Sequence, residues 1–154
     1  MIIETILHVN KCILETLNKS SETTGRTRTF IIMLLMQRVM SDNQKMLKSY
    51  SRIRYQERDK KDNWHRLHII LNEYEYEYYQ DMRKFYKMSI SFILAYAIRR
   101  YLDNIVNKLL NSNNNTDNYH FRNYVFVKET IDEVTCWRIY WGIPQKLPGI
   151  ITSQ

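Results

Sequence analysis

Few side chains in this sequence stand at a spacing that chemistry could use. The segment "HRLH" at 65–68 holds two histidines three residues apart, but on a strand such residues point to opposite faces. Cys12 and Cys136 lie too far apart in the sequence for a zinc-ligand pair. Serine, histidine and aspartate are present without a nucleophile elbow or a glycine-rich phosphate loop. The sequence therefore predicts no metal site, no cofactor and no enzyme activity.

The net charge of the chain instead favours a binding role. The chain has 23 Lys and Arg against 16 Asp and Glu, which gives a formal charge of +7. Such an excess suggests a polyanionic partner, nucleic acid first and an acidic membrane surface second. Residues 1–62 hold most of this excess, with 12 Lys and Arg against 7 Asp and Glu.

Sequence features that would direct the chain to a membrane or an oxidising compartment are weak. The apolar run "FIIMLLM" at 30–36 is short beside the roughly 20 residues that a membrane-spanning helix needs. The N-terminus shows no basic segment with a cleavage-site pattern, so we expect no signal peptide. Two distant cysteines form no disulfide framework and are expected to be reduced thiols. These features predict a cytoplasmic protein with no membrane partner.

The chain should be mainly helical, because it has only three glycines and two prolines. Alternating apolar residues predict strands at 4–9 and 66–71, each followed by an asparagine that can cap a helix. Gly25 is suited to end the first helix, since glycine readily takes a positive φ. Helical spacing of apolar residues predicts four helices: 11–24, 73–86, one capped by Thr27 and one capped by Ser89.

The C-terminal part of the sequence has a different character. Residues 111–118, "NSNNNTDN", are predicted to be a loop. Residues 124–144 are predicted to form a β-hairpin, with a polar turn around Asp132 and Glu133. Three large apolar residues alternate along its second half: Trp137, Ile139 and Trp141. They would either pack on the helical core or form a surface for a protein partner, and the sequence leaves both open.

The elements before the Asn-rich loop occur twice in the sequence. A constant offset of 62 residues aligns strand with strand, cap with cap and helix with helix, without a gap. The matched pairs include Asn10 with Asn72, Glu15 with Glu77, Thr27 with Ser89, Phe30 with Phe92 and Arg38 with Arg100. One such unit alone leaves strand edges unpaired and an apolar face in water. Two units that pair their strands antiparallel and interlock their helices solve both problems.

The second copy, "RLHIILNEYEYEYYQDMRKFYKMSISFILAYAIRRYL" at 66–102, resembles a ribbon-helix-helix domain of the CopG/Arc repressor type. The resemblance rests on an alternating strand, a capped helix, a turn, a Ser or Thr cap, and a helix with paired apolar residues. Residues 4–41 resemble the pattern more loosely and keep the turn glycine of the family as Gly25. The resemblance implies a mainly α fold with short β elements, in which tandem ribbon-helix-helix units form a pseudo-dimer, followed by the C-terminal β-hairpin.

This resemblance implies five segments along the chain. They are a first unit at 1–42, a basic connector at 43–63, a second unit at 64–110, the Asn-rich loop at 111–118, and a hairpin with tail at 119–154. The connector is polar and basic, and we expect a solvated linker there.

In this family a two-stranded ribbon enters the major groove of DNA. The resemblance therefore implies a regulator that binds double-stranded DNA, such as a repressor, a plasmid-maintenance factor or an antitoxin. Strand alternation assigns the candidate base-reading side chains to the face opposite the core: Glu4, Ile6, His8, Arg66, His68 and Ile70. Arginine can read guanine with two hydrogen bonds, and isoleucine can pack on a thymine methyl group.

The start of the second helix in each unit supplies candidate phosphate contacts. Backbone N–H groups and the positive end of the helix dipole attract anions there. The side chains are Thr27, Arg28 and Thr29 in the first unit, and Lys87, Ser89 and Ser91 in the second. Such contacts position a protein on DNA without reading its sequence. Family members often bind DNA side by side, so we also expect self-association on DNA.

An alternative function comes from another class. The chain could be a non-enzymatic protein–protein interaction protein that has lost DNA binding and uses the aromatic C-terminal hairpin. Salt distinguishes the two functions, because DNA binding releases counterions and weakens steeply with salt, whereas aromatic contacts depend on salt far less.

Overall fold

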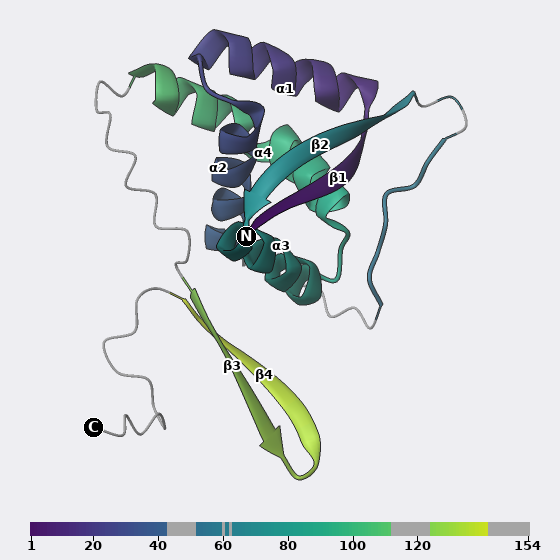
Figure 1. The fold of residues 1–154 in the computed structure, drawn as a ribbon, viewed down its shortest axis with the longest axis vertical. Coiled ribbons are helices and arrows are strands. Elements are labelled where there is room, and N and C mark those ends of the chain that lie inside the picture. The colour runs from purple at the N-terminus through teal and green to yellow at the C-terminus, as the bar shows by residue number, and fades with distance from the viewer. Residues whose placement is uncertain (43–51, 60, 62, 112–123, 142–154) are drawn as a thin grey trace. The chain divides into compact units, whose positions relative to one another are not determined.

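The computed structural model describes residues 1–42, 52–59, 61, 63–111 and 124–141, with only the backbone at 124–128 and 137–141. The chain divides into two compact parts, Met1–Asp117 and Asn118–Gln154, and the first part holds both of the repeated units. The described part is mainly helical and contains two short antiparallel ribbons, as the sequence predicts. Residues Met1–Asp117 contain β1 (Ile2–Asn10), α1 (Lys11–Thr24), α2 (Arg28–Ser41), β2 (Trp64–Asn72), α3 (Glu73–Tyr86) and α4 (Ile90–Asn111), and Figure 1 shows their arrangement.

The order strand, helix, helix occurs twice in Met1–Asp117. Corresponding elements begin 62 residues apart: Ile2 and Trp64, Lys11 and Glu73, Arg28 and Ile90. The predicted bounds of α1 and α3 are confirmed. Each strand is longer than predicted, by two residues at its start and one at its end.

Strands β1 and β2 pair antiparallel within the same chain, with Ile6 opposite His68 at the centre of the ribbon. Their burial alternates, because successive side chains of a strand point to opposite faces. The buried residues of the inward face are Leu7, Val9, Leu67, Ile69 and Leu71, and Ile3, Thr5 and His65 on the same face are half-buried. The ribbon thus covers the helical core with one face, and the predicted division of inner and outer residues is confirmed.

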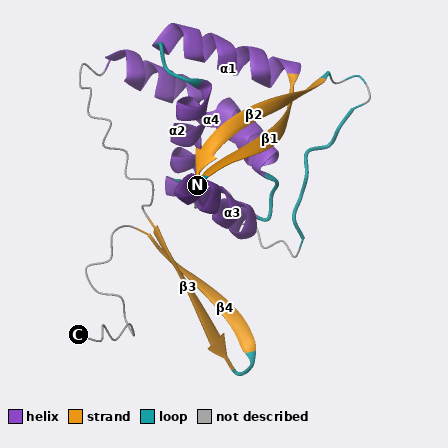
Figure 2. Cartoon of the chain, in the orientation of Figure 1, coloured by secondary structure: helices purple, strands orange, loops and turns teal. Residues whose placement is uncertain are grey.

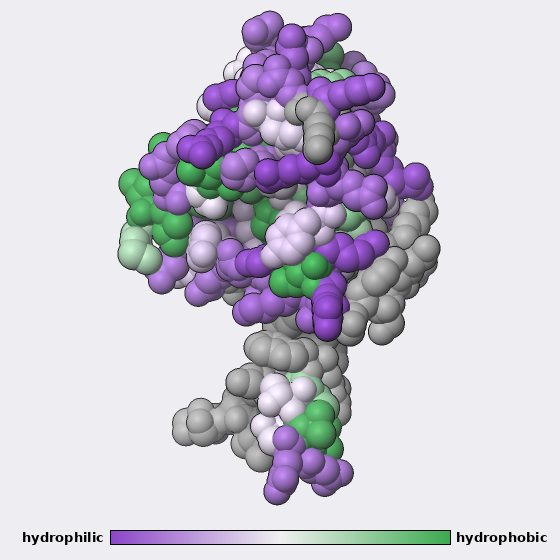
Figure 3. Space-filling model, turned by 90° about the vertical axis from the view of Figure 1, so that its right-hand side faces the viewer, coloured by the Kyte–Doolittle hydropathy of each residue, from purple (hydrophilic) through white to green (hydrophobic). Residues whose placement is uncertain are grey.

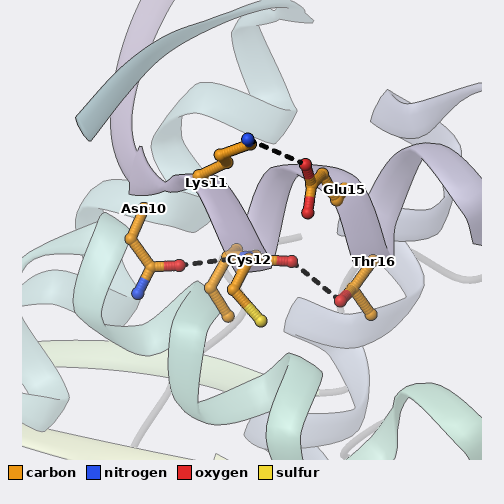
Figure 4. Close-up of polar contacts among 6 residues, drawn as sticks. Asn10, Lys11, Cys12, Glu15 and Thr16 are labelled. Atoms are coloured by element: carbon orange, nitrogen blue, oxygen red, sulfur yellow. Dashed lines mark hydrogen bonds and ion pairs between the residues drawn. The ribbon is translucent and has the colours of Figure 1, made fainter. Parts of the chain in front are cut away.

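Asparagine caps explain why a helix begins directly after each strand. The Asn10 side chain accepts a hydrogen bond of 2.9 Å from the backbone N–H of Ile13 (Figure 4). Within the first turns of α1, Thr16 donates to the carbonyl of Cys12 and Lys11 pairs with Glu15. Of these contacts, the Asn10 cap satisfies a backbone N–H that the start of a helix leaves without an intrahelical partner. The other two connect residues four positions apart along the helix.

The cap of α3 is reciprocal. The Asn72 side chain accepts from the Glu75 N–H at 2.9 Å, and the Glu75 carboxylate accepts from the Asn72 N–H at 2.7 Å. This capping box fixes the chain where it leaves the ribbon.

A left-handed residue ends the first helix of each unit. Gly25 has φ 66°, as predicted, and Lys87 holds the same position in the second unit with φ 53°. Glycine takes this conformation without a Cβ penalty, whereas lysine does not. The second turn therefore has the same geometry at a higher conformational cost.

The core lies where α2 of the first unit packs against α4 of the second unit, so both units contribute side chains to it. The buried side chains of α2 include Ile31, Ile32, Leu35, Met36 and Val39, and those of α4 include Ile93, Leu94, Ala97, Ile98 and Tyr101. Two hydrogen bonds also join the units: Tyr86 donates to the carbonyl of Val39 at 3.0 Å, and Tyr101 donates to Asp42 at 2.8 Å. Neither unit could bury these side chains alone.

The described part of the connector is hydrogen-bonded to the second unit at Arg54 and Gln56. The Arg54 N–H donates to the Lys87 carbonyl, and the Ser89 N–H donates to the Arg54 carbonyl, both at 2.8 Å. The Gln56 side chain donates to the carbonyl of Ser91 at 2.5 Å. Residues 52–59 are thus attached to the second unit at two points, while most of their side chains are exposed. Residues 43–51, 60 and 62 lie outside the described residues, so the linker there stays a prediction.

The part Asn118–Gln154 contains a hairpin of β3 (Tyr124–Ile131) and β4 (Val134–Trp141), drawn in orange in Figure 2. Asp132 and Glu133 form its two-residue turn, both with positive φ, as a type I′ turn requires. The predicted hairpin is confirmed. The aromatic side chains of 137–141 and the rest of the Asn-rich loop after Asn111 lie outside the described residues, so their predicted roles stay predictions.

Candidate nucleic-acid interface

The outward face of the β1–β2 ribbon brings together all six candidate base-reading residues. Opposite one another stand Glu4 and Ile70, Ile6 and His68, and His8 and Arg66. The two isoleucines are strongly exposed for apolar side chains, Ile6 at 43% and Ile70 at 63%. The ribbon therefore presents three cross-strand pairs on one surface.

The chemistry of this face is mixed and not strongly basic. His68 Nδ1 lies 2.7 Å from Glu4 Oε1, and both side chains are more than half exposed. Such a surface pair contributes about 0–1 kcal/mol to stability. The charge of Arg66 is balanced by that of Glu4 when the histidines are neutral. The face therefore offers hydrogen-bonding and methyl-contacting groups, while net positive charge has to come from its flanks.

Sequence reasoning missed the outward residues at the two ends of the ribbon. Ile2 is 79% exposed on the outward face, opposite Asn72. The β-branched pair Ile2–Ile3 was the signal that the first strand begins earlier. The view in Figure 3 shows a mostly hydrophilic described surface with separate hydrophobic areas. Exposed apolar side chains also occur outside the ribbon, at Tyr55, Tyr74 and Leu110.

The candidate phosphate residues of the first unit lie at the start of α2. Thr27 caps the helix, since its hydroxyl accepts from the Phe30 N–H at 3.2 Å. Arg28 is exposed, and its guanidinium donates to Asn18 of α1 at 3.2 Å. Thr29 is half-buried. Two cations lie at this helix start: Arg26 in the turn, which is half-buried, and Arg28 at the first residue of α2, which is exposed.

The second unit arranges its candidate phosphate residues differently. Ser89 caps α4 through its hydroxyl, which accepts from the Phe92 N–H at 3.3 Å. The Ser91 hydroxyl accepts from the backbone N–H of His8 at 3.0 Å and so fixes the ribbon to α4. Each hydroxyl still has its own proton to donate. Lys87 is half-buried in the turn.

The connector lines two cavities at this end of the ribbon. A cavity of about 190 Å³ is bordered by Arg58 together with His8, Ser89 and Ser91. A larger one of about 590 Å³ lies between the connector, the ribbon end and α4, and Arg54, Trp64 and Arg99 line it. Sequence reasoning missed the connector residues, although the basic and aromatic composition of "SRIRYQERDKK" was a signal for them.

The described residues show neither a metal site nor a membrane span. They contain no group of three or more His, Cys, Asp or Glu side chains that could hold a metal ion. Among the described helices, none combines the length and the hydropathy that crossing a bilayer requires. Compared with protein-family models, curated proteins and solved structures, the chain matches none of them.

Proposed function

We propose that this protein is a double-stranded DNA-binding regulator of the ribbon-helix-helix type, with both units of the pseudo-dimer in one chain. The observation that carries the proposal is the antiparallel pairing of β1 with β2. Its buried face rests on the helices, and its other face holds every candidate base-reading side chain.

The dimensions of the ribbon fit the major groove. Paired strands lie about 4.8 Å apart, and the major groove is about 12 Å wide and admits a two-stranded ribbon. The start of α4 lies against the ribbon, because the Ser91 hydroxyl accepts from the backbone N–H of His8. The start of α2 follows the corresponding turn of the first unit. Base edges would meet the ribbon, and phosphates would meet the helix starts.

Each outward side chain has a role suited to its chemistry. Arg66 would read guanine with two hydrogen bonds, and the two histidines can donate to or accept from base edges. Ile6 and Ile70 would pack on thymine methyl groups. The Glu4 carboxylate can accept a hydrogen bond from the N4 amino group of cytosine. It would then give up its contact with His68.

Most of the binding free energy would come from phosphates. The chain carries a net charge of +7, and each neutralised phosphate releases counterions. Side-by-side binding of two copies on one DNA site is part of the proposal. The mass of the complex, measured by sedimentation with and without DNA, tests this part.

The experiment that tests the proposal is fluorescence anisotropy on a pool of labelled duplexes at two salt concentrations. We compare the wild type with Arg66→Ala/His68→Ala. Lys108→Ala is the control, because this exposed residue lies about 27 Å along α4 from its first residue. The wild type and the control should bind tightly at low salt, lose affinity steeply with salt and prefer some sequences. The double variant should still bind but lose the preference.

Two outcomes contradict the proposal. If the wild type does not bind at low salt, the ribbon is no DNA-binding element, and protein–protein interaction becomes the function to test. If the double variant keeps the sequence preference of the wild type, the ribbon does not read bases. Circular dichroism confirms that each variant is folded, so a loss of structure is not mistaken for a loss of contacts.

A further inference from the structure

Two arginines stack on equivalent phenylalanines in the two units. The Arg26 guanidinium lies over the Phe30 ring, 5.3 Å from its centroid, and the Arg54 guanidinium lies over the Phe92 ring at 5.7 Å. Phe30 and Phe92 are each the third residue of their helix, α2 and α4. The same cation–π pair therefore stands at the same place in both halves, although its arginine comes from different parts of the chain.

The register of the repeat explains why the second arginine comes from the connector. The residue that corresponds to Arg26 at the 62-residue offset is Met88, which is buried and carries no charge. Arg54 forms an isolated parallel bridge with Met88, held by hydrogen bonds to the residues on either side of it. The connector thus places a guanidinium beside the position where the second turn lacks one.

The surroundings of Arg54 leave room for an anion. Arg54 lines the cavity of about 590 Å³ together with the exposed Arg99. Arg58, four residues further along the connector, stacks on Trp64 at 5.2 Å and borders the smaller cavity with His8 and Ser89. Two connector arginines therefore stand next to candidate DNA contacts.

The backbone at Arg54 is anchored without help from its side chain. Backbone hydrogen bonds already anchor the connector to the start of α4. A guanidinium adds a planar, weakly hydrated fork that can stack on an aromatic ring and bind a phosphate at the same time. In the first unit the turn and the helix start supply Arg26 and Arg28, whereas Lys87 is the only cation in the second turn.

We propose that Arg26 and Arg54 are equivalent phosphate contacts, one beside the second helix of each unit, and that the connector supplies the second of them. This inference rests on the proposed DNA binding and extends it to two residues outside the candidate set. The stacked phenylalanine holds each guanidinium in place, so the two contacts are preorganised before DNA arrives. The connector is then part of the DNA interface.

Salt-dependent binding to one random-sequence 24-base-pair duplex tests the inference, because phosphate contacts do not depend on sequence. Affinity is measured by anisotropy between about 50 and 300 mM salt. Arg26→Ala and Arg54→Ala should each lower the slope of log K against log[salt] by about 0.9, which is roughly an eightfold loss of affinity at 0.1 M. Arg54→Lys should keep the slope, since an ammonium can still bind a phosphate. Lys108→Ala is again the control.

The outcomes separate this inference from the function on which it rests. If the wild type shows no salt-dependent binding, the proposed function fails and this inference fails with it. If the wild type binds steeply but Arg54→Ala has the slope of Lys108→Ala, only this inference is overturned. A lower melting temperature of Arg54→Ala together with an unchanged slope would assign the arginine to connector packing.

Discussion

Two adjacent isoleucines of β2 offer a matched test of the ribbon. Ile69 is 1% exposed on the inward face, and Ile70 is 63% exposed on the outward face. Replacing either by alanine removes the same three carbon atoms from the same strand. At about 0.8 kcal/mol per buried carbon, Ile69→Ala loses about 2.4 kcal/mol of transfer free energy, and the cavity raises the cost to about 3–4 kcal/mol. Ile70→Ala should cost about 0.5 kcal/mol or less.

Urea denaturation followed by circular dichroism at 222 nm measures both free energies of unfolding. Ile69→Ala should lower the midpoint strongly, with little change in the slope of the transition. Ile70→Ala should unfold like the wild type and yet bind DNA more weakly, because it removes a candidate thymine contact. Equal destabilisation by the two substitutions would refute the reasoning, since it would mean that the outward face is also covered.

Two further predictions concern the turns and the tyrosines. An added Cβ at Gly25 would meet no atom within 4 Å, so Gly25→Ala adds only backbone strain and should cost about 1 kcal/mol, whereas Lys87→Gly should raise the melting temperature. Burial raises the pKa of Tyr79, Tyr86 and Tyr101 above the ordinary tyrosine value of 10.0. The folded state thus favours the protonated tyrosines, so stability should be intact below pH 10 and fall as the pH rises above it. Part of the tyrosinate absorbance should therefore appear only with unfolding, and ionisation of all twelve tyrosines before unfolding would contradict this coupling.

The sequence predicts the elements well because local signals determine them. Asparagine caps, the turn glycine and the periods of 2 and 3.6 residues act within a few positions of the chain. Burial within α3 was harder to predict. The spacing of three and four residues that predicts this helix joins Tyr76, Tyr79, Met82 and Tyr86. Tyr76 is only half-buried, whereas Tyr78, outside this pattern, is fully buried. Both positions lie near the edge of the apolar stripe, where the neighbouring elements, and not the helix itself, decide which side chain is covered.

In the candidate site, too, some features follow from the local sequence and others only from tertiary packing. The outward face of the ribbon follows from strand alternation alone, so Arg66 and its neighbours could be placed from the sequence. The hydrogen bond from the His8 N–H to the Ser91 hydroxyl could not be predicted from the sequence. The two residues are 83 positions apart and meet only when the ribbon packs on α4. The structure shows that one candidate phosphate residue also holds a candidate base-reading strand in place.

The connector was the hardest segment to predict, because backbone groups and not an apolar pattern hold its described part. A basic polar stretch has the composition of a linker, and nothing periodic in it indicates a parallel bridge to Met88. The offset of 62 residues nevertheless contained a clue, since it pairs Arg26 with an uncharged residue in an otherwise similar turn. If both halves of a pseudo-dimer bind the same phosphate backbone, a cation lost from one turn has to be supplied from elsewhere. The basic connector, which ends one residue before the second strand, is the nearest source.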